Sequence, residues 1–392
     1  MHPSHERHTA AAQPANDVDV TVVIPCLDEA DGVGVCVKKA LGAFENHALR
    51  CEVVVVDNGS TDGSAEVATA AGARVVVESR RGYGAACRGG FAAARGSMLV
   101  MGDADDSYDF SDVMRFVEPL RDGADMVIGT RLKGDILPGA MPWTHRWIGN
   151  PILSGMLRLM FHTTVSDAHC GLRSITREAY HRIDLRTEGM EFASEMVVNA
   201  LREGLRIKEV PISYRPRIGV SKLSGFRDAW RHIRFMLIYA PSYLYQLPGL
   251  LLMAFGGAIV ALLARGPFEA FGRAWDLHVL LFGALALILG YNVVLFDVLA
   301  KTFSMGAGLA KPNRWLRTLT SGFSLERGLI VGALLALAGI AVEAAVIREW
   351  IRVGYGELRE VRAVVIGMTA MVLGAQTVFA SFLINLMLIR RR

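Results

Sequence analysis

The chain has 392 residues, of which 52% are hydrophobic, and it carries a formal net charge of +4 at neutral pH. One domain rarely needs that length, so we expect at least two parts. The charge is too small to favour a nucleic-acid partner, and the basic surplus lies near apolar segments, as the positive-inside rule describes. Charged residues are frequent up to Arg234 and sparse afterwards, which predicts a soluble half followed by a membrane half.

Residues 1–18 are polar and predict a disordered tail. The three histidines of this segment leave a metal-binding tract as the alternative. The segment lacks the apolar core of a signal peptide, so we expect the domain that follows, 19–223, to stay in the cytoplasm. None of the five cysteines forms a Cys-x-x-Cys pair, which predicts reduced, buried thiols.

Short apolar strands alternate with helices through residues 19–223. This alternation implies a mostly parallel sheet with flanking helices and right-handed crossovers, which is an α/β architecture. The expected strands are 19–25, 52–56, 73–78, 98–101 and 124–129. The expected helices are 31–44, a helix that begins near Thr61 with Thr61 or Asp62 as its cap, and 85–94.

Two of these strands end abruptly in carboxylates. Strand 52–56 leads into Asp57, and strand 98–101 leads into Asp103 and Asp105. Ligands of open α/β sheets bind at the carboxyl ends of the strands. Hard oxygen ligands suit Mg²⁺ or Mn²⁺, and such ions are usually shared with substrate phosphates. We therefore predict a nucleotide site with a metal held by Asp105 and Asp103, the alternative being a solvated turn after an edge strand.

Motifs along this half resemble glycosyltransferase family 2 and occur in that family's order. They lie at 23–29, 56–64, 102–105 and 129–131. The similarity covers about residues 19–240 and is to the polyprenyl-phosphate glycosyltransferases, such as the dolichyl-phosphate mannose and glucose synthases; the blocks 167–173 and 219–223 belong to that branch. The resemblance implies a GT-A fold, a nucleotide-sugar donor, Mg²⁺ or Mn²⁺ as cofactor, and a lipid phosphate acceptor.

The resemblance also assigns the donor pocket. Asp105 would hold the metal across the diphosphate, which stabilises the leaving nucleotide. Asp103 would hydrogen-bond the ribose or support the metal, and Asp57 would contact the base or ribose. The expected nucleotide-sugar-binding residues are Pro25, Leu27, Glu29, Asp57, Asp103, Ala104 and Lys222.

The expected acceptor already carries its nucleophile. A lipid monophosphate has a second pKa of about 6 and is anionic at neutral pH, so it needs no general base. It needs positioning by cations, and arginine binds phosphate through two parallel hydrogen bonds. The resemblance gives this role to Arg131 and Arg146, which with Asp105 are the expected catalytic residues, and Asn150 can donate to the same phosphate. An ordinary surface or headgroup position is the alternative for Arg146.

Further polar residues are expected near the acceptor. Glu195 lies at helical spacing with Glu191 and Asn199, which indicates either a solvated helix face or a carboxylate that orients Arg173. Asp167 is expected to orient an arginine in the same way.

The resemblance has two gaps. Some relatives carry a glutamine two residues after the metal aspartate, where this chain has Ser107, so the third metal ligand is open. Relatives often carry an arginine three residues before the glycine of block 219–223. Here Pro216 holds that place between Arg215 and Arg217, and either arginine can take the role.

Residues 224–241 have the pattern of an interfacial amphipathic helix, with apolar and basic residues on neighbouring faces. The alternative is an ordinary amphipathic helix packed on the catalytic domain. The apolar positions are Phe226, Trp230, Ile233 and Leu237, and the basic positions are Arg227, Arg231 and Arg234.

Residues 242–392 contain four apolar stretches, each near the roughly 20 residues that cross a bilayer. They are 243–264, 277–300, 329–347 and 361–389. The loop 301–327 carries five cations against one acid, and the chain ends in three arginines, so the positive-inside rule places the loop and both termini in the cytoplasm. For Asp297 and Glu343 we expect structural pairing or an interface position rather than a transport pathway.

These features predict a multi-pass membrane enzyme that transfers one hexose, with inversion, from a nucleotide sugar to a polyprenyl phosphate at the cytosolic face. UDP-glucose is the favoured donor and GDP-mannose the alternative, and assembly into a homo-oligomer is left open. A processive polysaccharide synthase is a second hypothesis, although its Gln-x-x-Arg-Trp motif is missing. A lipid flippase with a nucleotide-binding domain is a third, although the spans hold few central charges.

Overall fold

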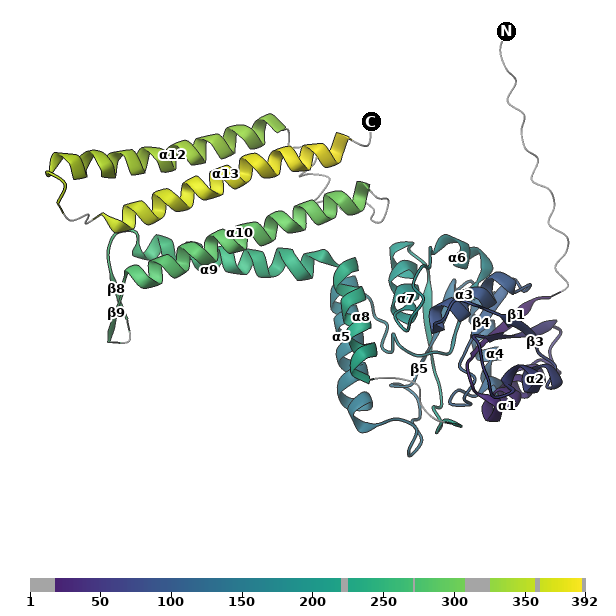
Figure 1. The fold of residues 1–392 in the computed structure, drawn as a ribbon. Helices are drawn as coiled ribbons and strands as arrows, with labels where there is room; N and C mark the ends of the chain where they lie inside the picture. The colour runs from purple at the N-terminus through teal and green to yellow at the C-terminus, as the bar shows by residue number, and fades with distance from the viewer. Residues whose placement is uncertain (1–17, 220–224, 271, 307–324, 357–359, 390–392) are drawn as a thin grey trace, which may run out of the picture. The chain divides into compact units, whose positions relative to one another are not determined.

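The structure is a computed structural model that describes residues 18–219, 225–270, 272–306, 325–356 and 360–389. Lys222 and most of the expected tail lie outside the described residues. The chain forms two compact units, residues 1–236 and 237–392, which we call the catalytic unit and the membrane unit. Figure 1 traces the chain through both.

A seven-stranded sheet organises the catalytic unit, in the order β3-β2-β1-β4-β6-β5-β7. β1 pairs in parallel with β2 and β4, β2 with β3, and β5 with β7, whereas β6 is antiparallel to β4 and β5. The expected mostly parallel sheet is confirmed. Its strands are β1 (Val20–Cys26), β2 (Cys51–Asp57), β3 (Arg74–Val77), β4 (Met98–Met101), β5 (Met126–Thr130), β6 (Arg173–Thr176) and β7 (Ile207–Pro211).

Helices flank this sheet, with α1 and α2 on one side and α3 and α7 on the other (Figure 1). The central strands β1, β2 and β4 are buried runs of apolar residues, as expected for strands covered on both faces. The helices are α1 (Ala30–Gly42), α2 (Ser64–Ala70), α3 (Tyr83–Ala93), α4 (Met114–Arg121), α5 (Asn150–Phe161), α6 (Arg177–Arg182), α7 (Phe192–Arg202) and α8 (Gly225–Tyr239).

The expected start of α2 is wrong by three residues. The helix begins at Ser64, and its N-cap is Gly63 in a left-handed conformation with φ of 85°. Asp62 lies before the helix, where its carboxylate accepts hydrogen bonds from the backbone N–H groups of Ala30 and Ser64. The aspartate thus ties the loop after β2 to the start of α1 instead of capping α2.

The cysteines are as expected. All five are free; Cys26, Cys36, Cys87 and Cys170 are buried, and Cys51 is half-buried. Burial raises the pKa of Cys26 to about 11 and that of Cys36 to about 12, so these thiols remain protonated at neutral pH.

The helix α8 combines the two alternatives that the sequence left open. His232, Phe235 and Met236 are buried, so one face of the helix is packed. The aromatic face is open, because Phe226 is 89% exposed and Trp230 is 53% exposed. Contact of that face with lipid headgroups stays a prediction.

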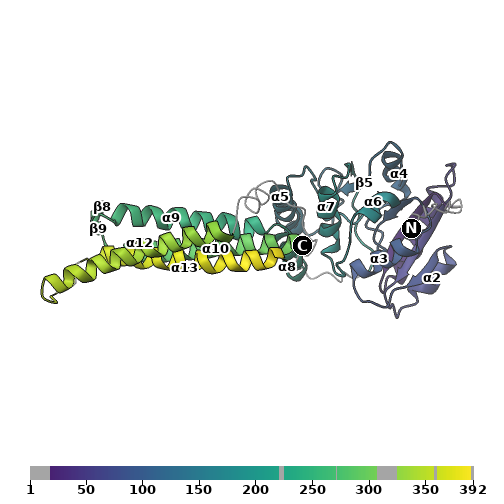
Figure 2. The ribbon, with the colours of Figure 1, turned by 90° about the horizontal axis from the view of Figure 1, so that it is seen from above.

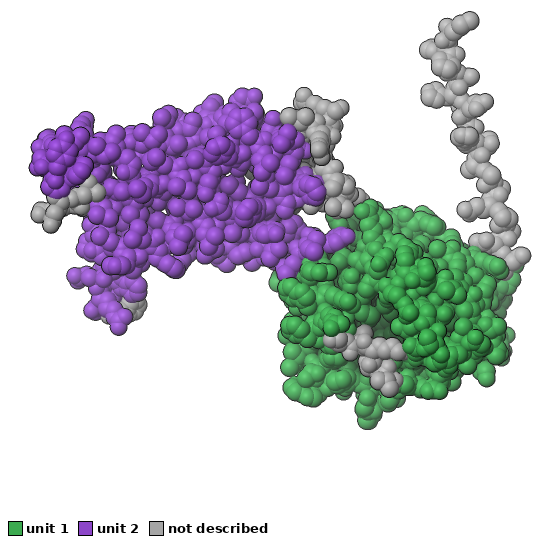
Figure 3. Space-filling model, viewed as in Figure 1, with its two compact units in different colours: residues 1–236 green, residues 237–392 purple. Residues whose placement is uncertain are grey.

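The membrane unit contains four long helices that run side by side (Figures 1 and 2). They are α9 (Leu247–Leu263), α10 (Leu277–Gly306), α12 (Leu325–Arg352) and α13 (Val361–Ile389). Each is long and apolar enough to cross a membrane, α9 together with the π-helical turn Ser242–Gln246, so the four expected spans are confirmed. A short hairpin of β8 (Phe268–Ala270) and β9 (Arg273–Trp275) joins α9 to α10. Figure 3 shows both units as solid surfaces.

Glycines set the close packing of these helices in pairs. A Cβ on Gly256 of α9 would lie 2.5 Å from the carbonyl oxygen of Gly283 on α10. A Cβ on Gly339 of α12 would lie equally close, 2.5 Å, to the carbonyl oxygen of Gly367 on α13. Small residues let membrane helices approach to backbone contact. Second glycine pairs, seven residues away on each helix, repeat the contact: Gly249 with Gly290, and Gly332 with Gly374.

The polar residues of the spans are partly paired. Lys301 donates hydrogen bonds to Asp297 at 2.6 Å and to Gln246 at 3.0 Å, which confirms the expected pairing of Asp297. Glu343 lies against Gly367, and its Oε1 is buried without a hydrogen-bond partner in the part of the chain that the structure describes.

Candidate functional site

A cavity of about 330 Å³ lies at the carboxyl ends of β1, β2 and β4 in the catalytic unit. Seven expected site residues line it: Pro25, Leu27, Glu29, Asp103, Ala104, Asp105 and Arg217. Ten residues complete the lining: Cys26, Asn58, Arg81, Gly82, Tyr83, Ala86, Met190, Tyr214, Asp228 and Arg231. The other expected residues with described positions lie outside the lining: Asp57, Arg131, Arg146, Asn150, Asp167, Arg173, Glu195 and Arg215.

Asp105 follows β4 and is fixed by a tight turn. Its Oδ1 accepts hydrogen bonds from the backbone N–H of Ser107 at 3.1 Å and from the Ser107 hydroxyl at 2.6 Å. Its Oδ2 lies 3.4 Å from Nη1 of Arg217. Ser107, which stands where some relatives carry a glutamine, therefore orients Asp105. The other carboxylate oxygen of Asp105, Oδ2, faces the positive charge of Arg217.

Asp103 is held from the opposite wall of the cavity. The hydroxyl of Tyr83, in the first turn of α3, donates to its Oδ1 at 2.9 Å. Burial and the charge of Asp105 raise the pKa of Asp103 to about 7. A buried pair of carboxylates with this like-charge repulsion favours a positively charged partner.

The helix α1 packs directly on this acidic turn. A Cβ on Gly32 would lie 2.5 Å from the carbonyl oxygen of Ala104 and 3.2 Å from the Cα of Asp105. Only a residue without a side chain permits that approach. The backbone of α1 therefore positions the turn that carries both carboxylates.

Arg217 resolves the choice between two arginines. Its Nη2 donates to Glu29 at 3.0 Å, and its Nη1 lies near Asp105, so its guanidinium bridges two walls of the cavity. Arg215 instead pairs with Asp109. Arg217 thus lines the cavity and Arg215 does not, and contact of either arginine with a substrate stays a prediction.

These residues suit a divalent cation. Asp103 and Asp105 supply hard carboxylate oxygens, the ligand type of Mg²⁺ and Mn²⁺. The guanidinium of Arg217 already places positive charge against Asp105. No cluster of three or more His, Cys, Asp or Glu side chains with metal-binding geometry exists among the described residues.

Asn58 is a lining residue that the sequence analysis missed. Its Nδ2 donates to the carbonyl oxygens of Glu78 and Arg80, each at 2.8 Å, and its Oδ1 accepts from the N–H of Gly82 at 2.8 Å. Asp57, which was expected to contact the nucleotide, accepts from the N–H of Ser60 and does not line the cavity. The sequence signal that pointed to Asn58 was its position directly after Asp57, at the end of β2.

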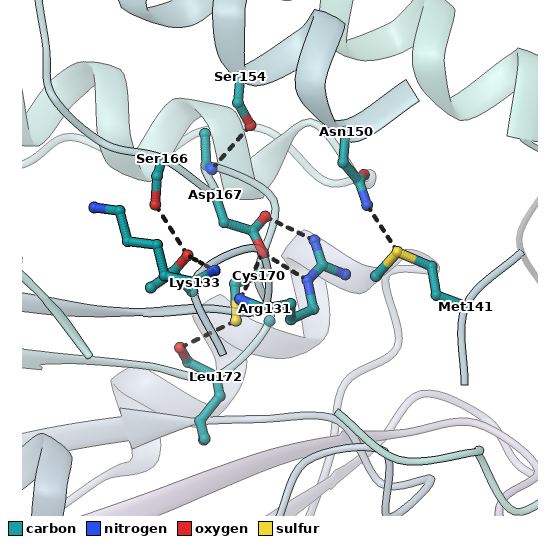
Figure 4. A network of polar contacts seen from close by, with 12 residues as sticks. Arg131, Lys133, Met141, Asn150, Ser154, Ser166, Asp167, Cys170 and Leu172 are labelled. Carbon is teal, nitrogen blue, oxygen red and sulfur yellow. Dashed lines mark hydrogen bonds and ion pairs between the residues drawn. The ribbon is translucent and has the colours of Figure 1, made fainter. Parts of the chain in front are cut away.

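Arg131 forms a buried ion pair with Asp167 (Figure 4). Its Nε and Nη2 donate to the two carboxylate oxygens at 2.7 and 2.8 Å, and its backbone N–H adds a third bond at 3.0 Å. Burial is the largest influence on Arg131 and would lower its pKa, but the charge and hydrogen bond of Asp167 together with the charges of Tyr108 and Cys170 raise the pKa overall. Asp167 thus holds an arginine, Arg131, and a role of this pair near an acceptor phosphate stays a prediction.

Arg146 and Asn150 do not reach the cavity. Arg146 lies in the π-helical turn His145–Gly149, is exposed, and stacks over the ring of Trp147 at 5.2 Å. Asn150 begins α5, and its Nδ2 donates to the sulfur of Met141 at 3.4 Å (Figure 4). Their roles toward an acceptor stay predictions.

Both expectations for Glu195 are wrong. It does not pair with Arg173, and it does not lie on a solvated helix face. Glu195 is fully buried and accepts from the N–H groups of Arg186 and Thr187 and from the Thr187 hydroxyl. Arg173 donates to three backbone carbonyls, at Ala168, Cys170 and Ala193. Backbone groups satisfy both charges, so neither needs the other. We call Arg131, Asp167, Arg173 and Glu195 the polar core.

Two lining residues come from α8. Asp228 and Arg231 lie one helical turn apart and form an ion pair at 3.4 Å. The sequence placed Arg231 with Arg227 and Arg234 on one basic face of the helix, but the surroundings of the three side chains differ. Arg231 lines the cavity, whereas Arg227 and Arg234 are exposed.

Comparisons with known proteins agree with this architecture. Residues 21–184 match the family model "Glycosyl transferase family 2", and residues 298–388 match "Glycosyltransferase family 2 C-terminal transmembrane region". The low-salt glycan biosynthesis hexosyltransferase Agl6 of Haloferax volcanii is 38% identical over 367 residues, which is 93% of this chain and 88% of the relative. The dolichyl-phosphate hexose transferase of the same organism is 36% identical over 45% of this chain and 75% of its own length.

Among solved structures, glucosyl-3-phosphoglycerate synthase from Mycobacterium tuberculosis shares 23% identity over 56% of this chain and 79% of that chain, with a TM-score of 0.47. That similarity is too low to transfer any property to this chain. The relative that aligns over nearly the whole length and the two matching family regions agree. The chain is an integral membrane protein that belongs to glycosyltransferase family 2.

Proposed function

We propose that the protein transfers one hexose from a nucleotide sugar to a polyprenyl phosphate, with inversion at the anomeric carbon. The cavity carries this proposal, because it joins the carboxylates of Asp103 and Asp105 to arginines of two different segments, Arg217 and Arg231. The names of two relatives, a hexosyltransferase and a dolichyl-phosphate hexose transferase, support it. We favour UDP-glucose as the donor, with GDP-mannose as the alternative.

The donor end of the cavity is built to meet a diphosphate. A Mg²⁺ or Mn²⁺ ion held by Asp103 and Asp105 supplies positive charge for the leaving nucleoside diphosphate when it is bound. Ser107 binds Oδ1 of Asp105 and leaves Oδ2 facing Arg217, and the hydroxyl of Tyr83 fixes Asp103. Arg217 can exchange its carboxylate contacts for phosphate oxygens, because a guanidinium binds both groups in the same geometry.

The reaction needs no protein base. An acceptor phosphate oxygen forms the new bond to the anomeric carbon, the bond from that carbon to the diphosphate breaks, and the nucleoside diphosphate leaves with the electron pair. The acceptor is already anionic at neutral pH, so no proton has to be removed. One displacement of this kind inverts the anomeric centre.

We also propose that the catalytic unit faces the cytoplasm. The segment 301–327 includes the end of α10 and the start of α12 and carries five cations and one acid, and the positive-inside rule assigns such a connection to the cytoplasmic side. With four spans, the chain before the first span lies on that same side. Protease access in sealed inverted vesicles, compared with right-side-out vesicles, tests this orientation.

Turnover by the purified full-length protein in detergent tests the proposed function. Radiolabelled UDP-glucose and GDP-mannose are each supplied with undecaprenyl phosphate or dolichyl phosphate, with Mn²⁺ or with EDTA. We expect label to enter the organic phase as a lipid that carries one hexose, and EDTA to abolish the transfer. The anomeric configuration of the product, compared with the donor by NMR, tests inversion.

The same assay separates the other hypotheses. A polymer that grows with time would indicate a processive synthase. Lack of turnover in detergent, together with lipid movement in sealed proteoliposomes, would indicate a flippase. Either result would overturn the proposed function.

A further inference from the structure

Three arginines of the described residues line the cavity, and each comes from a different segment. Arg81 follows β3 and donates to the carbonyl of Gly59 in the turn after β2, which puts it beside the strand end expected to meet the nucleotide. Arg217 bridges Glu29 and Asp105 at the acidic turn. Arg231 is on α8, and its ion pair is with Asp228 of the same helix. The contacts of the first two arginines assign them to the donor end of the cavity, whereas Arg231 has no such contact among the described residues.

The pairing of Arg231 leaves it exchangeable. Its ion pair with Asp228 spans 3.4 Å, and the arginine side chain is 42% exposed. Asp228 is only 15% exposed, but the arginine end of the pair is open to solvent and the contact is long, so an incoming phosphate can compete with the carboxylate for the guanidinium. Arg131, by contrast, is held by Asp167 through three short bonds in a buried site.

The place of Arg231 in the chain favours a lipid ligand. From Arg231 the helix α8 continues to Tyr239, which corresponds to about 12 Å of helix. The first span begins at Ser242, only three residues later. The short stretch of chain between Arg231 and the first span therefore limits how far this side chain can lie from the membrane that holds the lipid phosphate. Arg81, in contrast, is far from any span in sequence.

We propose that Arg231 binds the phosphate of the acceptor lipid inside the cavity, exchanging its contact with Asp228 for two hydrogen bonds to phosphate oxygens. The inference rests on the proposed function for the identity of the acceptor. It adds that a residue of the juxtamembrane helix, and not only residues of the sheet, recognises the acceptor. Asp228 then keeps the empty guanidinium oriented between turnovers.

Binding of a soluble probe tests the inference without any need for turnover. Full-length wild-type protein and the Arg231→Gln variant are titrated in detergent with farnesyl phosphate, with farnesol as the uncharged control, and separately with UDP. We expect Arg231→Gln to weaken farnesyl phosphate binding about ten- to a hundredfold, because charge-assisted hydrogen bonds are lost. Its affinity for UDP should stay within twofold, which also shows that the variant is folded.

Arg234→Gln is the matched control, because Arg234 lies on the same helix, carries the same charge and is exposed outside the cavity. It should bind farnesyl phosphate as the wild type does, and Arg231→Lys should recover part of the affinity. Equal losses at positions 231 and 234 would show general attraction by a basic helix and would overturn the inference. So would unchanged farnesyl phosphate binding in Arg231→Gln, or a loss of UDP binding in its place, which would assign Arg231 to the donor diphosphate.

Kinetics then separate the two proposals. If the wild type transfers hexose and Arg231→Gln raises the KM for the lipid but not for the nucleotide sugar, both stand. If the wild type binds farnesyl phosphate through Arg231 but transfers no sugar, the proposed function fails and this inference stands. If transfer proceeds with an unchanged lipid KM in Arg231→Gln, the inference fails and the function stands.

Discussion

The charged side chains of the cavity and of the polar core differ in how closely they are paired. In the cavity, Arg217 and Arg231 each meet an aspartate at 3.4 Å, and Arg217 also donates to Glu29 at 3.0 Å. In the polar core, Arg131 meets Asp167 at 2.7 and 2.8 Å, and Arg173 reaches three carbonyls at 2.6–2.7 Å. Short, mutually satisfied contacts hold a fold together, whereas long contacts leave charge that a ligand can take over. The difference separates the groups that bind substrate from those that shape the site.

The largest effect is expected at Asp105 in the cavity. Asp105→Ala should lower the rate of transfer by about a thousandfold or more, because neutralising the diphosphate is worth several kcal/mol. Its thermal unfolding midpoint should stay near that of the wild type, because the residue follows β4 and is not part of the strand. Turnover and Mn²⁺ titration check this, with Asp112→Ala, an exposed aspartate paired to Arg115, as the control. Wild-type Mn²⁺ affinity in Asp105→Ala would remove the metal assignment.

Asp167 in the polar core should show the reverse pattern. Asp167→Ala leaves the buried charge of Arg131 without its partner and should lower the free energy of unfolding by about 3–5 kcal/mol. Asp125→Ala breaks a more exposed aspartate–arginine pair in the same unit and should cost less than about 1 kcal/mol. Urea unfolding followed by tryptophan fluorescence measures both. Equal costs would mean that burial does not distinguish the two regions.

The acid sensitivity of the catalytic unit sharpens the comparison. His232 packs on His169 and bonds the Ser194 hydroxyl beside the polar core, and burial lowers its pKa from 6.5 to about 4. The unfolded chain therefore takes up a proton that the folded chain refuses as the pH falls below 6.5. The resulting loss of stability reaches about 3 kcal/mol near pH 4 and is absent above pH 7.

Unfolding free energies between pH 7.5 and pH 4.5 check this prediction. Arg173 opposes protonation of His232 and Asp228 favours it, so both are kept unchanged in the test. In His232→Asn, which retains a polar partner for Ser194 but does not titrate, the slope with pH should be shallower. An identical slope would place the acid sensitivity elsewhere.

The smallest effect is expected at Arg217. Arg217→Gln should raise the KM for the nucleotide sugar about tenfold, since one charge-assisted contact to the diphosphate is lost. Arg215→Gln is the control, because Arg215 pairs with Asp109 outside the cavity, and its KM should not change. A larger effect at Arg215 than at Arg217 would reverse the assignment made from the geometry.

Much of this architecture follows from pattern. Buried strands, acidic strand ends and four apolar stretches predict the sheet, the turn of Asp103 and Asp105, and the spans. The strand β6 was not predicted, because it is four residues long and begins with the charged Arg173. Its antiparallel direction depends on contacts with β4 and β5, which are distant in sequence.

The contacts that the site residues make are harder to predict from the sequence. Helical spacing shows that Arg227, Arg231 and Arg234 share a face, but it does not show that only Arg231 meets a cavity. Spacing likewise marks Glu195 as part of a polar stripe, while its actual partners are backbone N–H groups of a loop. Hydrogen bonds to the main chain carry no residue-type signature, so such burial is found only in three dimensions.

The glycine pairs of the membrane unit have a mechanical consequence. In each hairpin the two helices touch backbone to backbone at two points seven residues apart, on α9 with α10 and on α12 with α13. Side chains of the partner helix pack over these glycines: Ile259 over Gly283, Val294 over Gly249, Val378 over Gly332 and Met371 over Gly339. This interlocking resists sliding of the two helices past each other. A bilayer thinner or thicker than the spans therefore tilts each hairpin as one rigid body, and the strain is absorbed by the lipid around it.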